Sequence, residues 1–237
     1  MLKRLLKKII YGKKYSSESY ILYLKKIGVK IGRDCTIYSP KNTIIDEQYP
    51  WLISIGNHVR ITEGVILLTH DYSWSVLKRF NEEERGVILG AAGSINIGNN
   101  VFIGMNTVVL RNVTIGDNVI IGAGSIVSKN CESNWVYAGN PAKKIMTVKE
   151  FYNRRKEMQL EEAKKLAISY KERYGKIPPK EVFHEFFMLF TTVDKLEKPF
   201  VDKMKLCENF EDSMEYMKNF VPIFSNYEEF IRYCLDE

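Results

Sequence analysis

A repeat of six residues dominates the middle of the chain and constrains the fold more than any other feature. The aliphatic residues of this repeat follow one another at intervals of six: Ile97, Ile103, Val109, Ile115, Ile121 and Val127. An amphipathic α-helix places apolar residues at a period of about 3.6, and an ordinary strand alternates over short runs. A regular hexad fits neither pattern. We therefore predict a coil in which each hexapeptide forms one short strand and one corner.

The corners of this coil are marked by residues that tolerate left-handed backbone conformations. These residues each follow a repeat aliphatic by three positions: Asn100, Asn106, Asn112, Asn118 and Gly124. Three hexads make one turn, so we expect Ile97 to stack on Ile115, Ile103 on Ile121 and Val109 on Val127. Less regular repeats of the same aliphatic position precede them, at Ile31, Ile37, Ile55, Ile61 and Leu67. The predicted fold is mainly β, a left-handed parallel β-helix over residues 28–146.

The hexads fail between Leu67 and Ile95. A long insertion in a compact domain is usually functional or disordered. The aromatic residues Tyr72, Trp74 and Phe80 argue against disorder, so we predict that residues 71–94 form a loop that protrudes and folds over a neighbouring subunit. The flat outer faces of this coil, which has the shape of a three-sided prism, are free to pack against other chains. We expect a homotrimer.

The last ninety residues change character and predict a helical C-terminal extension, residues 147–237. Apolar residues at helical spacing predict a helix over Val148–Tyr174, which Gly175 and a Pro-Pro pair would end. Further helices are expected over Lys180–Phe190 and around Glu211–Phe220. Asn226 and Glu229 form a capping box that opens a last helix through Leu235.

Positive charge is concentrated at the N-terminus. The formal net charge is +6, and residues 1–30 carry nine Lys and Arg against the single acid Glu18. Within the basic segment 1–27, the first ten residues predict an amphipathic helix. That helix can pack on its own protein or lie on an anionic membrane surface. No aromatic-interleaved basic motif accompanies the charge, so we expect no nucleic-acid partner.

Cysteine usage and hydropathy favour a cytoplasmic protein. The four cysteines are scattered and form no CxxC pair. The chain has no apolar run of eighteen residues and no signal-peptide pattern at its start. The basic N-terminus leaves the inner face of a membrane as an alternative location.

The three histidines have different explanations. His58 occupies the corner position that holds Asn in later hexads, and His184 lies among the aromatics of EVFHEFFMLF as a packed or surface residue. His70 sits where the repeat breaks, in LLTHDYSW, beside Asp71. Imidazole can accept a hydroxyl proton near neutral pH, and a carboxylate can fix its tautomer. We predict His70 as a general base with Asp71 as its partner, although Asp71 could equally face solvent.

Several motifs together resemble one family. The hexads, the THD at 69–71, and the segments VFIGMNTVVLRNVTIGDNVIIGAGSIVSKN and VYAGNPAKKI are similar to the hexapeptide-repeat acyltransferases over about residues 30–146. The branch they resemble is that of maltose/galactoside acetyltransferases, which includes capsular and exopolysaccharide O-acetyltransferases. The resemblance implies acetyl-CoA as co-substrate, no metal, and an active site in a groove between two prisms of a trimer. It also implies that the loop histidine deprotonates a hydroxyl that attacks the thioester directly.

The resemblance also implies roles for individual residues. Phe102 would stand beside the pantetheine arm, where the family often has Trp, and Ala123 would offer backbone hydrogen bonds to pantetheine. The residues expected at the CoA phosphates are Ser128, Lys129 and Lys143, whereas we interpret Lys144 as a surface lysine.

On the acceptor side, the stretch NTIID would put Asn42 and Asp46 near the reacting hydroxyl, and we assign Trp74 of the loop to substrate binding. Glu63 departs from the family, which often has Pro or a small residue at that corner.

The leading hypothesis is an acetyl-CoA-dependent O-acetyltransferase acting on a sugar, a surface polysaccharide or its precursor. An N-acetyltransferase acting on an amino sugar is the main rival, because His70 could also take a proton from an amine. A β-helix scaffold without activity explains the hexads but not THD, IGAG and NPAK. A zinc carbonic anhydrase needs three converging histidines, and the coil has two. A serine acetyltransferase would carry its helical region before the coil.

Overall fold

The computed structural model describes residue 6 and residues 9–236. Most of the predicted N-terminal amphipathic helix therefore lies outside the described residues. The chain divides into two compact units, Met1–Phe151 and Tyr152–Glu237. Each unit has its own hydrophobic core.

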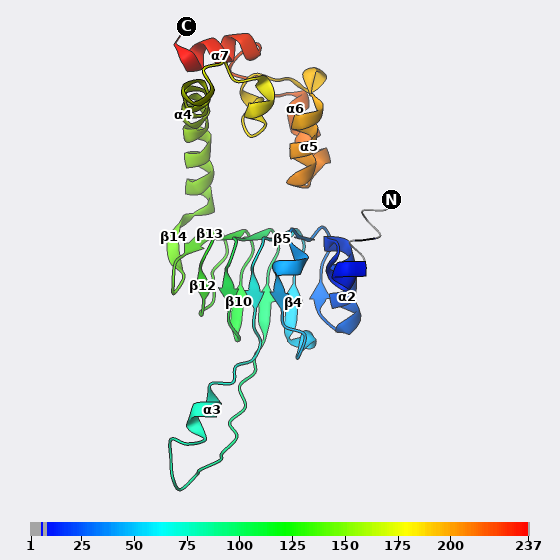
Figure 1. Cartoon of the computed structure of the whole chain (residues 1–237), viewed down its shortest axis with the longest axis vertical. Helices are drawn as coiled ribbons and strands as arrows, with labels where there is room; N and C mark the ends of the chain where they lie inside the picture. Colours follow the sequence, from blue (N-terminus) through cyan, green and yellow to red (C-terminus); the bar gives the residue numbers. More distant parts are fainter. Residues whose placement is uncertain (1–5, 7–8, 237) are drawn as a thin grey trace. The chain divides into compact units, whose positions relative to one another are not determined.

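The first unit is a three-sided coil of short strands (Figure 1). Face A contains β1 (Lys30–Ile31), β4 (Ile53–Ile55), β7 (Ile95–Ile97) and β10 (Val113–Ile115). Face B contains β2 (Thr36–Ile37), β5 (Val59–Ile61), β8 (Val101–Ile103), β11 (Val119–Ile121), β13 (Trp135–Ala138) and β14 (Lys143–Thr147). Face C contains β3 (Ile44–Ile45), β6 (Ile66–Leu67), β9 (Val108–Val109) and β12 (Ile126–Val127). The chain visits the faces in the order A, B, C, and every strand pair is parallel except β13 with β14.

The hexad pairing is as predicted. Ile97 pairs with Ile115, Ile103 with Ile121 and Val109 with Val127. The less regular repeats join the same columns, since Ile31, Ile37 and Leu67 pair within the coil as well. All six aliphatics of the strong repeat are at most 4% exposed. The repeat therefore builds the core of the coil, because every sixth side chain points inward.

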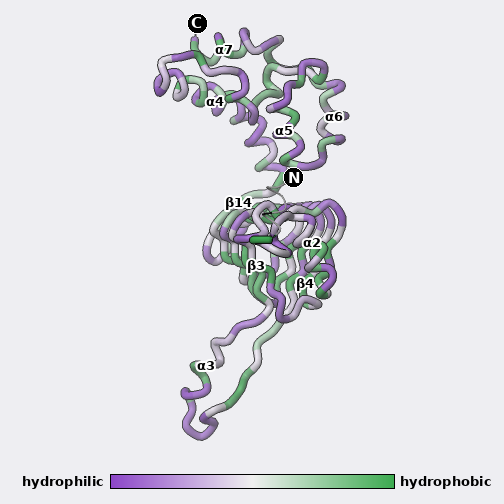
Figure 2. The backbone as a smooth tube through the Cα atoms, turned by 45° about the vertical axis from the view of Figure 1, so that its right-hand side comes forward, coloured by the Kyte–Doolittle hydropathy of each residue, from purple (hydrophilic) through white to green (hydrophobic). Residues whose placement is uncertain are grey.

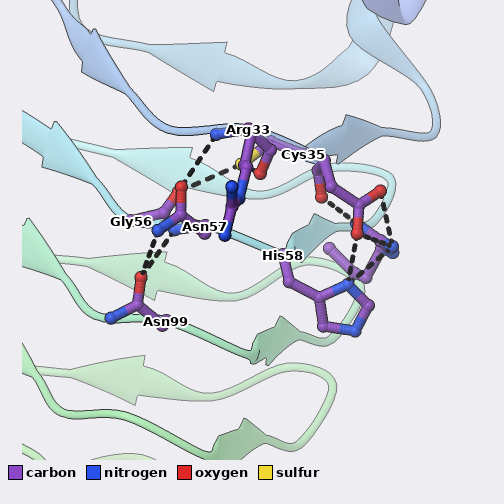
Figure 3. A network of polar contacts seen from close by, with 8 residues as sticks. Arg33, Cys35, Gly56, Asn57, His58 and Asn99 are labelled. Atoms are coloured by element: carbon purple, nitrogen blue, oxygen red, sulfur yellow. Dashed lines mark hydrogen bonds and ion pairs between the residues drawn. The ribbon is translucent and has the colours of Figure 1, made fainter. Parts of the chain in front are cut away.

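The corners adopt the left-handed conformation that the sequence predicted. Asn100, Asn106, Asn112, Asn118 and Gly124 have φ between 53° and 69°. Side chains also tie successive corners between faces A and B into a ladder. Its steps include Arg33 N–H to Asn57 Oδ1 and Asn57 N–H to Asn99 Oδ1, each 2.9 Å (Figure 3). These bonds satisfy corner amides that lie outside the strands.

A long arm leaves the coil between faces C and A (Figure 1). It contains the short helix α3 (Trp74–Leu77), and hydrophobic and hydrophilic stretches alternate along it (Figure 2). Its two roots are held together by backbone hydrogen bonds from Asp71 N–H to Ala91 O, 3.1 Å, and from Gly93 N–H to Thr69 O, 2.8 Å. The residue between them, His70, forms an antiparallel bridge with Ala92.

The N-terminal part of this unit packs on the coil. It contains the 3-10 turn η1 (Gly12–Lys14) and the helix α2 (Ser17–Ile27), and two further 3-10 turns, η2 (Pro40–Asn42) and η3 (Pro50–Leu52), interrupt the first coil. Ser16 caps α2 by accepting a hydrogen bond from Ser19 N–H, and Gly28 ends it at φ 115°. Tyr20 and Leu24 of α2 are fully buried in the coil core.

The second unit is helical around an aromatic core. Its elements are α4 (Val148–Tyr174), η4 (Lys180–Phe183), η5 (Phe187–Leu189), η6 (Val193–Lys195), α5 (Lys198–Leu206), α6 (Phe210–Lys218) and α7 (Tyr227–Leu235). The predicted helix over Val148–Tyr174 is confirmed, and α6 lies where a helix was expected. The cap by Asn226 is confirmed, since its Oδ1 accepts from Glu229 N–H at 2.8 Å. The Glu229 carboxylate accepts from Ser225 N–H at 2.8 Å, one residue before the position that a capping box requires.

The helical unit differs from the expectations in two places. Residues 180–190 form two 3-10 turns in place of one helix. Phe183, Phe187 and Phe190 have the spacing of one helical face, but Leu189 is buried as well and would lie off that face of a regular helix. The helix α5 was not foreseen. No helix among the described residues is both long enough and apolar enough to cross a membrane.

Candidate active site

His70 forms a close pair with Asp46. Its Nδ1 lies 2.6 Å from Asp46 Oδ2, although the two residues are separated by 24 positions in the sequence. Asp46 comes from the corner between faces C and A in the first coil, and His70 comes from the same corner one coil later. The coil therefore stacks the two side chains. The side chain of Asp46 is 5% exposed and that of His70 is 18% exposed.

Hydrogen bonds hold the Asp46 carboxylate in place. Oδ2 accepts from the backbone N–H of Thr69 at 3.0 Å and also from its hydroxyl, while Oδ1 accepts from Gln48 N–H at 2.9 Å. Burial alone would raise the pKa of Asp46, but the bonds from Thr69, Gln48 and His70 outweigh it and lower that pKa below its ordinary value of 3.8. Asp46 is therefore ionised near neutral pH and can act only as a hydrogen-bond acceptor.

This carboxylate selects one tautomer of His70. An ionised carboxylate at 2.6 Å requires a proton on Nδ1, so the lone pair of the neutral ring lies on Nε2. None of the residues that the structure describes hydrogen-bonds Nε2 of His70. The arrangement can accept a proton at Nε2 and stabilise the imidazolium that forms.

Asp71, which we expected to orient His70, has other partners. Its Oδ1 accepts from Ser73 N–H at 2.9 Å, and its Oδ2 accepts from Arg111 Nε at 3.1 Å. Hydrogen bonds from Ser73, and then the bond from Arg111, lower the pKa of Asp71. Successive side chains on an extended segment point to opposite sides, so Asp71 turns away from the ring next to it. It ties the root of the arm to the following coil.

A small pocket surrounds the candidate base. Its volume is about 270 Å³, and it is lined by Leu68, His70, Asp71, Leu110, Arg111 and Ser128. These residues come from the same corner in three successive coils, since Leu68 N–H bonds to Val109 O and Leu110 N–H bonds to Val127 O. Ser128, expected at the CoA phosphates, is therefore in one pocket with His70, and Lys129 follows it as an exposed residue.

The other predicted site residues lie elsewhere on the coil. Asn42 is at the corner between faces B and C, where its amide donates to Glu63. Ala123 is exposed at the same kind of corner three coils later. Phe102 is 41% exposed in the middle of β8 on face B. Lys143 is exposed at the start of β14. Within one chain, the structure does not bring these residues together with His70.

Trp74, predicted to bind substrate, opens α3 of the arm and is half-buried. Its ring centroid lies 6.3 Å from that of Tyr72, which in turn lies 4.9 Å from the His70 ring. Lys144, interpreted as a surface lysine, pairs with Glu132 at 2.7 Å and lies over the Trp135 ring.

The remaining histidines occupy structural positions. His58 has φ 55°, as its corner position predicted. Figure 3 shows it at the end of the corner network, where its Nδ1 lies 2.7 Å from Asp34 Oδ2. The coil thus carries a second His–Asp pair, and Arg60 also contacts this carboxylate. His184 Nδ1 lies 3.1 Å from Glu181 O in the second unit.

Sequence reasoning missed Arg111, Tyr49 and Gln48 near His70. Extending the hexad register would have placed Arg111 at the arm's corner one coil later. Gln48 and Tyr49 lie beside the predicted Asp46, but they had no signal of their own. Among the described residues, no group of three or more His, Cys, Asp or Glu side chains could hold a metal ion.

Comparison with known proteins gives two kinds of match. The family model described as bacterial transferase hexapeptide (six repeats) matches residues 94–129. Protein CapG of Staphylococcus aureus is 45% identical over 129 residues, which is 54% of this chain and 71% of CapG.

Solved structures also resemble the chain. A maltose O-acetyltransferase from Clostridium difficile 630 is 23% identical, with a TM-score of 0.40, over 61% of this chain and 83% of that chain. A hexapeptide-repeat acetyltransferase of Vibrio cholerae complexed with acetyl coenzyme A is 18% identical, with a TM-score of 0.42, over 61% and 84%.

The identity to CapG over most of its length agrees with the repeat that builds the coil and with the matched family model. The chain therefore belongs to the bacterial hexapeptide-repeat transferases, the acyltransferase family that its motifs resemble.

Proposed function

We propose that this protein is an acetyl-CoA-dependent O-acetyltransferase in which His70 is the general base. The observation that carries the proposal is the 2.6 Å contact between His70 Nδ1 and the buried Asp46 carboxylate. It leaves Nε2 as the basic atom of a residue that lines a pocket. Asp46 takes the orienting role that the sequence had suggested for Asp71.

The proposed reaction is a direct transfer. Nε2 of His70 accepts the proton of an acceptor hydroxyl as its oxygen attacks the thioester carbonyl of acetyl-CoA. The tetrahedral intermediate then collapses, the C–S bond breaks, and the imidazolium returns the proton to the thiolate of CoA. The products are an acetyl ester and free CoA. Asp46 stabilises the imidazolium between these two proton transfers, and such general-base catalysis contributes roughly 10²–10⁴-fold.

We further propose that the complete site needs two chains of a homotrimer of left-handed coils. Phe102 on face B and Ala123 at the B–C corner, which the family resemblance assigns to pantetheine, lie on other sides of the coil from His70. A neighbouring chain can supply these residues opposite His70. Lys129 and Lys143 are exposed and suit the phosphates of CoA. Residues 28–146 would carry the reaction, with residues 147–237 as an extension.

The resemblance to capsular and exopolysaccharide O-acetyltransferases supports a sugar hydroxyl as the acceptor. Because acetyl-CoA is the donor, we propose a cytoplasmic reaction, and the basic residues 3–8 would suit an acceptor held at the inner face of a membrane.

The test measures release of the CoA thiol from acetyl-CoA with a panel of sugar and glycan acceptors. We expect His70→Ala to lower kcat/KM by roughly 10²–10⁴-fold, because the base is lost. The matched control is His58→Asn, which removes the other His of a His–Asp pair but keeps a residue that tolerates φ 55°. It should retain activity.

Product analysis separates the rival chemistries. Mild alkali removes acetyl from an oxygen ester but not from an amide, so an alkali-stable product would favour N-acetylation. Full activity in His70→Ala, or no thiol release with any acceptor, would refute the proposal.

A further inference from the structure

One oxygen of the Asp46 carboxylate is shared between the candidate base and the residue before it. Oδ2 lies 2.6 Å from His70 Nδ1, and it accepts hydrogen bonds from the backbone N–H of Thr69, at 3.0 Å, and from the Thr69 hydroxyl. A carboxylate oxygen offers about two lone-pair sites. Three donors therefore compete for one oxygen, and a change in the bonds from Thr69 also changes the bond to His70.

Thr69 is held so that its hydroxyl reaches this oxygen. The residue is fully buried, and its carbonyl accepts from Gly93 N–H at 2.8 Å across the root of the arm. Among the described residues, Asp46 is the one partner of the hydroxyl. Because Asp46 is ionised, it can only accept, so the Thr69 hydroxyl donates.

The bond from Thr69 weakens the attraction between Asp46 and a protonated His70. Burial would raise the pKa of Asp46, but hydrogen bonds lower it, and the bond from the Thr69 hydroxyl is the largest of these. A carboxylate that is already stabilised by a donor offers less of its charge to the proton on Nδ1. Asp46 thus favours the imidazolium, and Thr69 limits how strongly it does so.

The other His–Asp pair of the coil shows a stronger form of such sharing. There, Arg60 Nη2 lies 3.2 Å from Asp34 Oδ2 and 2.9 Å from His58 Nδ1. A guanidinium cancels the charge of the carboxylate and repels an imidazolium. At His70 the sharing donor is a neutral hydroxyl, so the attraction is reduced but kept. This intermediate strength suits a base that must take up a proton and return it.

We propose that Thr69 is a positioning residue that sets the lower limit of the pH range in which His70 can act as the base. The inference rests on the proposed function, because it takes His70 as the base. Thr69 is fully buried and acts only through the Asp46 carboxylate. Without its hydroxyl, Oδ2 attracts the Nδ1 proton more strongly, and the imidazolium persists to higher pH.

Other charged and titratable groups also lie near the pair. They are the ion pair of Asp71 with Arg111, the ion pair of Glu47 with Lys13, and the rings of Tyr49 and Tyr72. In the described part of the chain, none of these side chains hydrogen-bonds to the Asp46 carboxylate. A substitution at Thr69 therefore leaves their effects on His70 in place.

Thr69→Val tests the proposal, because valine keeps the branched shape and removes the hydroxyl. Nitrogen NMR of the histidine rings follows their protonation without any turnover. We expect the pH at which the His70 ring becomes protonated to rise by about 0.5–1 unit. His58 has its own carboxylate and is the internal standard, so its signals should change at the same pH as in the original protein.

The pH profile of kcat/KM gives a second reading. Thr69→Val should lose about three- to tenfold on the acidic side of the profile and stay within about twofold of the original protein on the basic plateau. Thr69→Ser keeps a hydroxyl and should restore both the profile and the NMR signals. Thr69→Ala repeats the test if circular dichroism shows that Thr69→Val does not fold, since it also lacks the hydroxyl.

Thr107→Val is the matched control. Thr107 is fully buried like Thr69, and its hydroxyl donates to Gly122 O at 3.2 Å. That carbonyl keeps a second bond, from the Ser125 hydroxyl at 2.6 Å, so the substitution leaves no acceptor without a donor. The His70 signals and the pH profile should both be unchanged.

The outcomes separate this inference from the proposed function. An unchanged or lower pH of His70 protonation in Thr69→Val overturns the inference, whatever the activity. A loss by the same factor at every pH, or no restoration by Thr69→Ser, also overturns it, because Thr69 would then have only a structural role. If the NMR shift occurs but no acceptor yields free CoA thiol, the effect of Thr69 on His70 stands and the proposed function fails.

Discussion

Replacing Asp46 by Asn tests the pair at the centre of the proposed site. The substitution keeps the size of the side chain but removes its charge, and the new amide can donate a hydrogen bond to Nδ1 of His70. The proton of the neutral ring would then move to Nε2, which could no longer accept one. Asp46 is 6% exposed, so water compensates little for the lost charge.

The geometry of the His70–Asp46 contact sets the size of the expected loss in kcat. With Nδ1 and Oδ2 at 2.6 Å, the centres of the imidazolium and carboxylate charges lie about 4 Å apart. Two unit charges at that separation attract by about 4 kcal/mol at an effective dielectric constant of about 20. Since about 1.4 kcal/mol corresponds to a factor of ten, Asp46→Asn should lower kcat about 10³-fold.

The assay is thiol release at saturating acetyl-CoA, with circular dichroism to verify folding. Because Asp46 acts through His70, adding Asp46→Asn to His70→Ala should cause little further loss. The matched control is Asp34→Asn, which neutralises the carboxylate of the other His–Asp pair and should retain kcat. An Asp46→Asn enzyme within threefold of the original kcat, or losses that multiply in the double variant, would refute the reasoning.

Three further predictions concern the frame around this pair. Gly104→Ala should destabilise the coil by about 1–3 kcal/mol in urea denaturation, because the new Cβ would lie 2.5 Å from a backbone nitrogen of the next coil. The control is Gly90→Ala, whose new Cβ meets nothing within 4 Å, and it should leave the free energy of unfolding unchanged. Arg111→Gln should remove the ion pair with Asp71 and lower kcat less than tenfold. Because that pair holds the root of the arm, limited proteolysis should cleave the arm faster, and an unchanged cleavage rate would contradict the prediction. The folded-state pKa of Asp46 is lowered, so its contribution to stability is present above the ordinary value of 3.8 and is lost as pH falls through the folded pKa. The difference in unfolding free energy between the original protein and Asp46→Asn should therefore shrink below about pH 3.8, and a constant difference down to pH 2 would exclude that role.

The coil could be predicted in detail because a hexad is a local code. Each aliphatic side chain must point inward at the same place in every strand, so the stacking of Ile103 on Ile121 followed from spacing alone. The corner residues could be predicted equally well, because left-handed φ values restrict the residue type at positions such as Asn118. The second unit lacks such a repeat. Its aromatic core overrode the local helical pattern of residues 180–190.

The candidate site could be predicted only in part from local sequence. His70 was predicted because it is the histidine at the position where the repeat breaks. Its neighbour Asp71 was the natural choice of partner from the sequence, yet adjacent side chains on an extended segment diverge. Stacking of successive coils brought Asp46 to the ring from 24 residues away and took Asp71 to Arg111. The sequence by itself determined the coil and pointed to His70 as the candidate base, since both depend on period and position. Only the tertiary structure decided which carboxylate contacts His70, because that contact joins different coils.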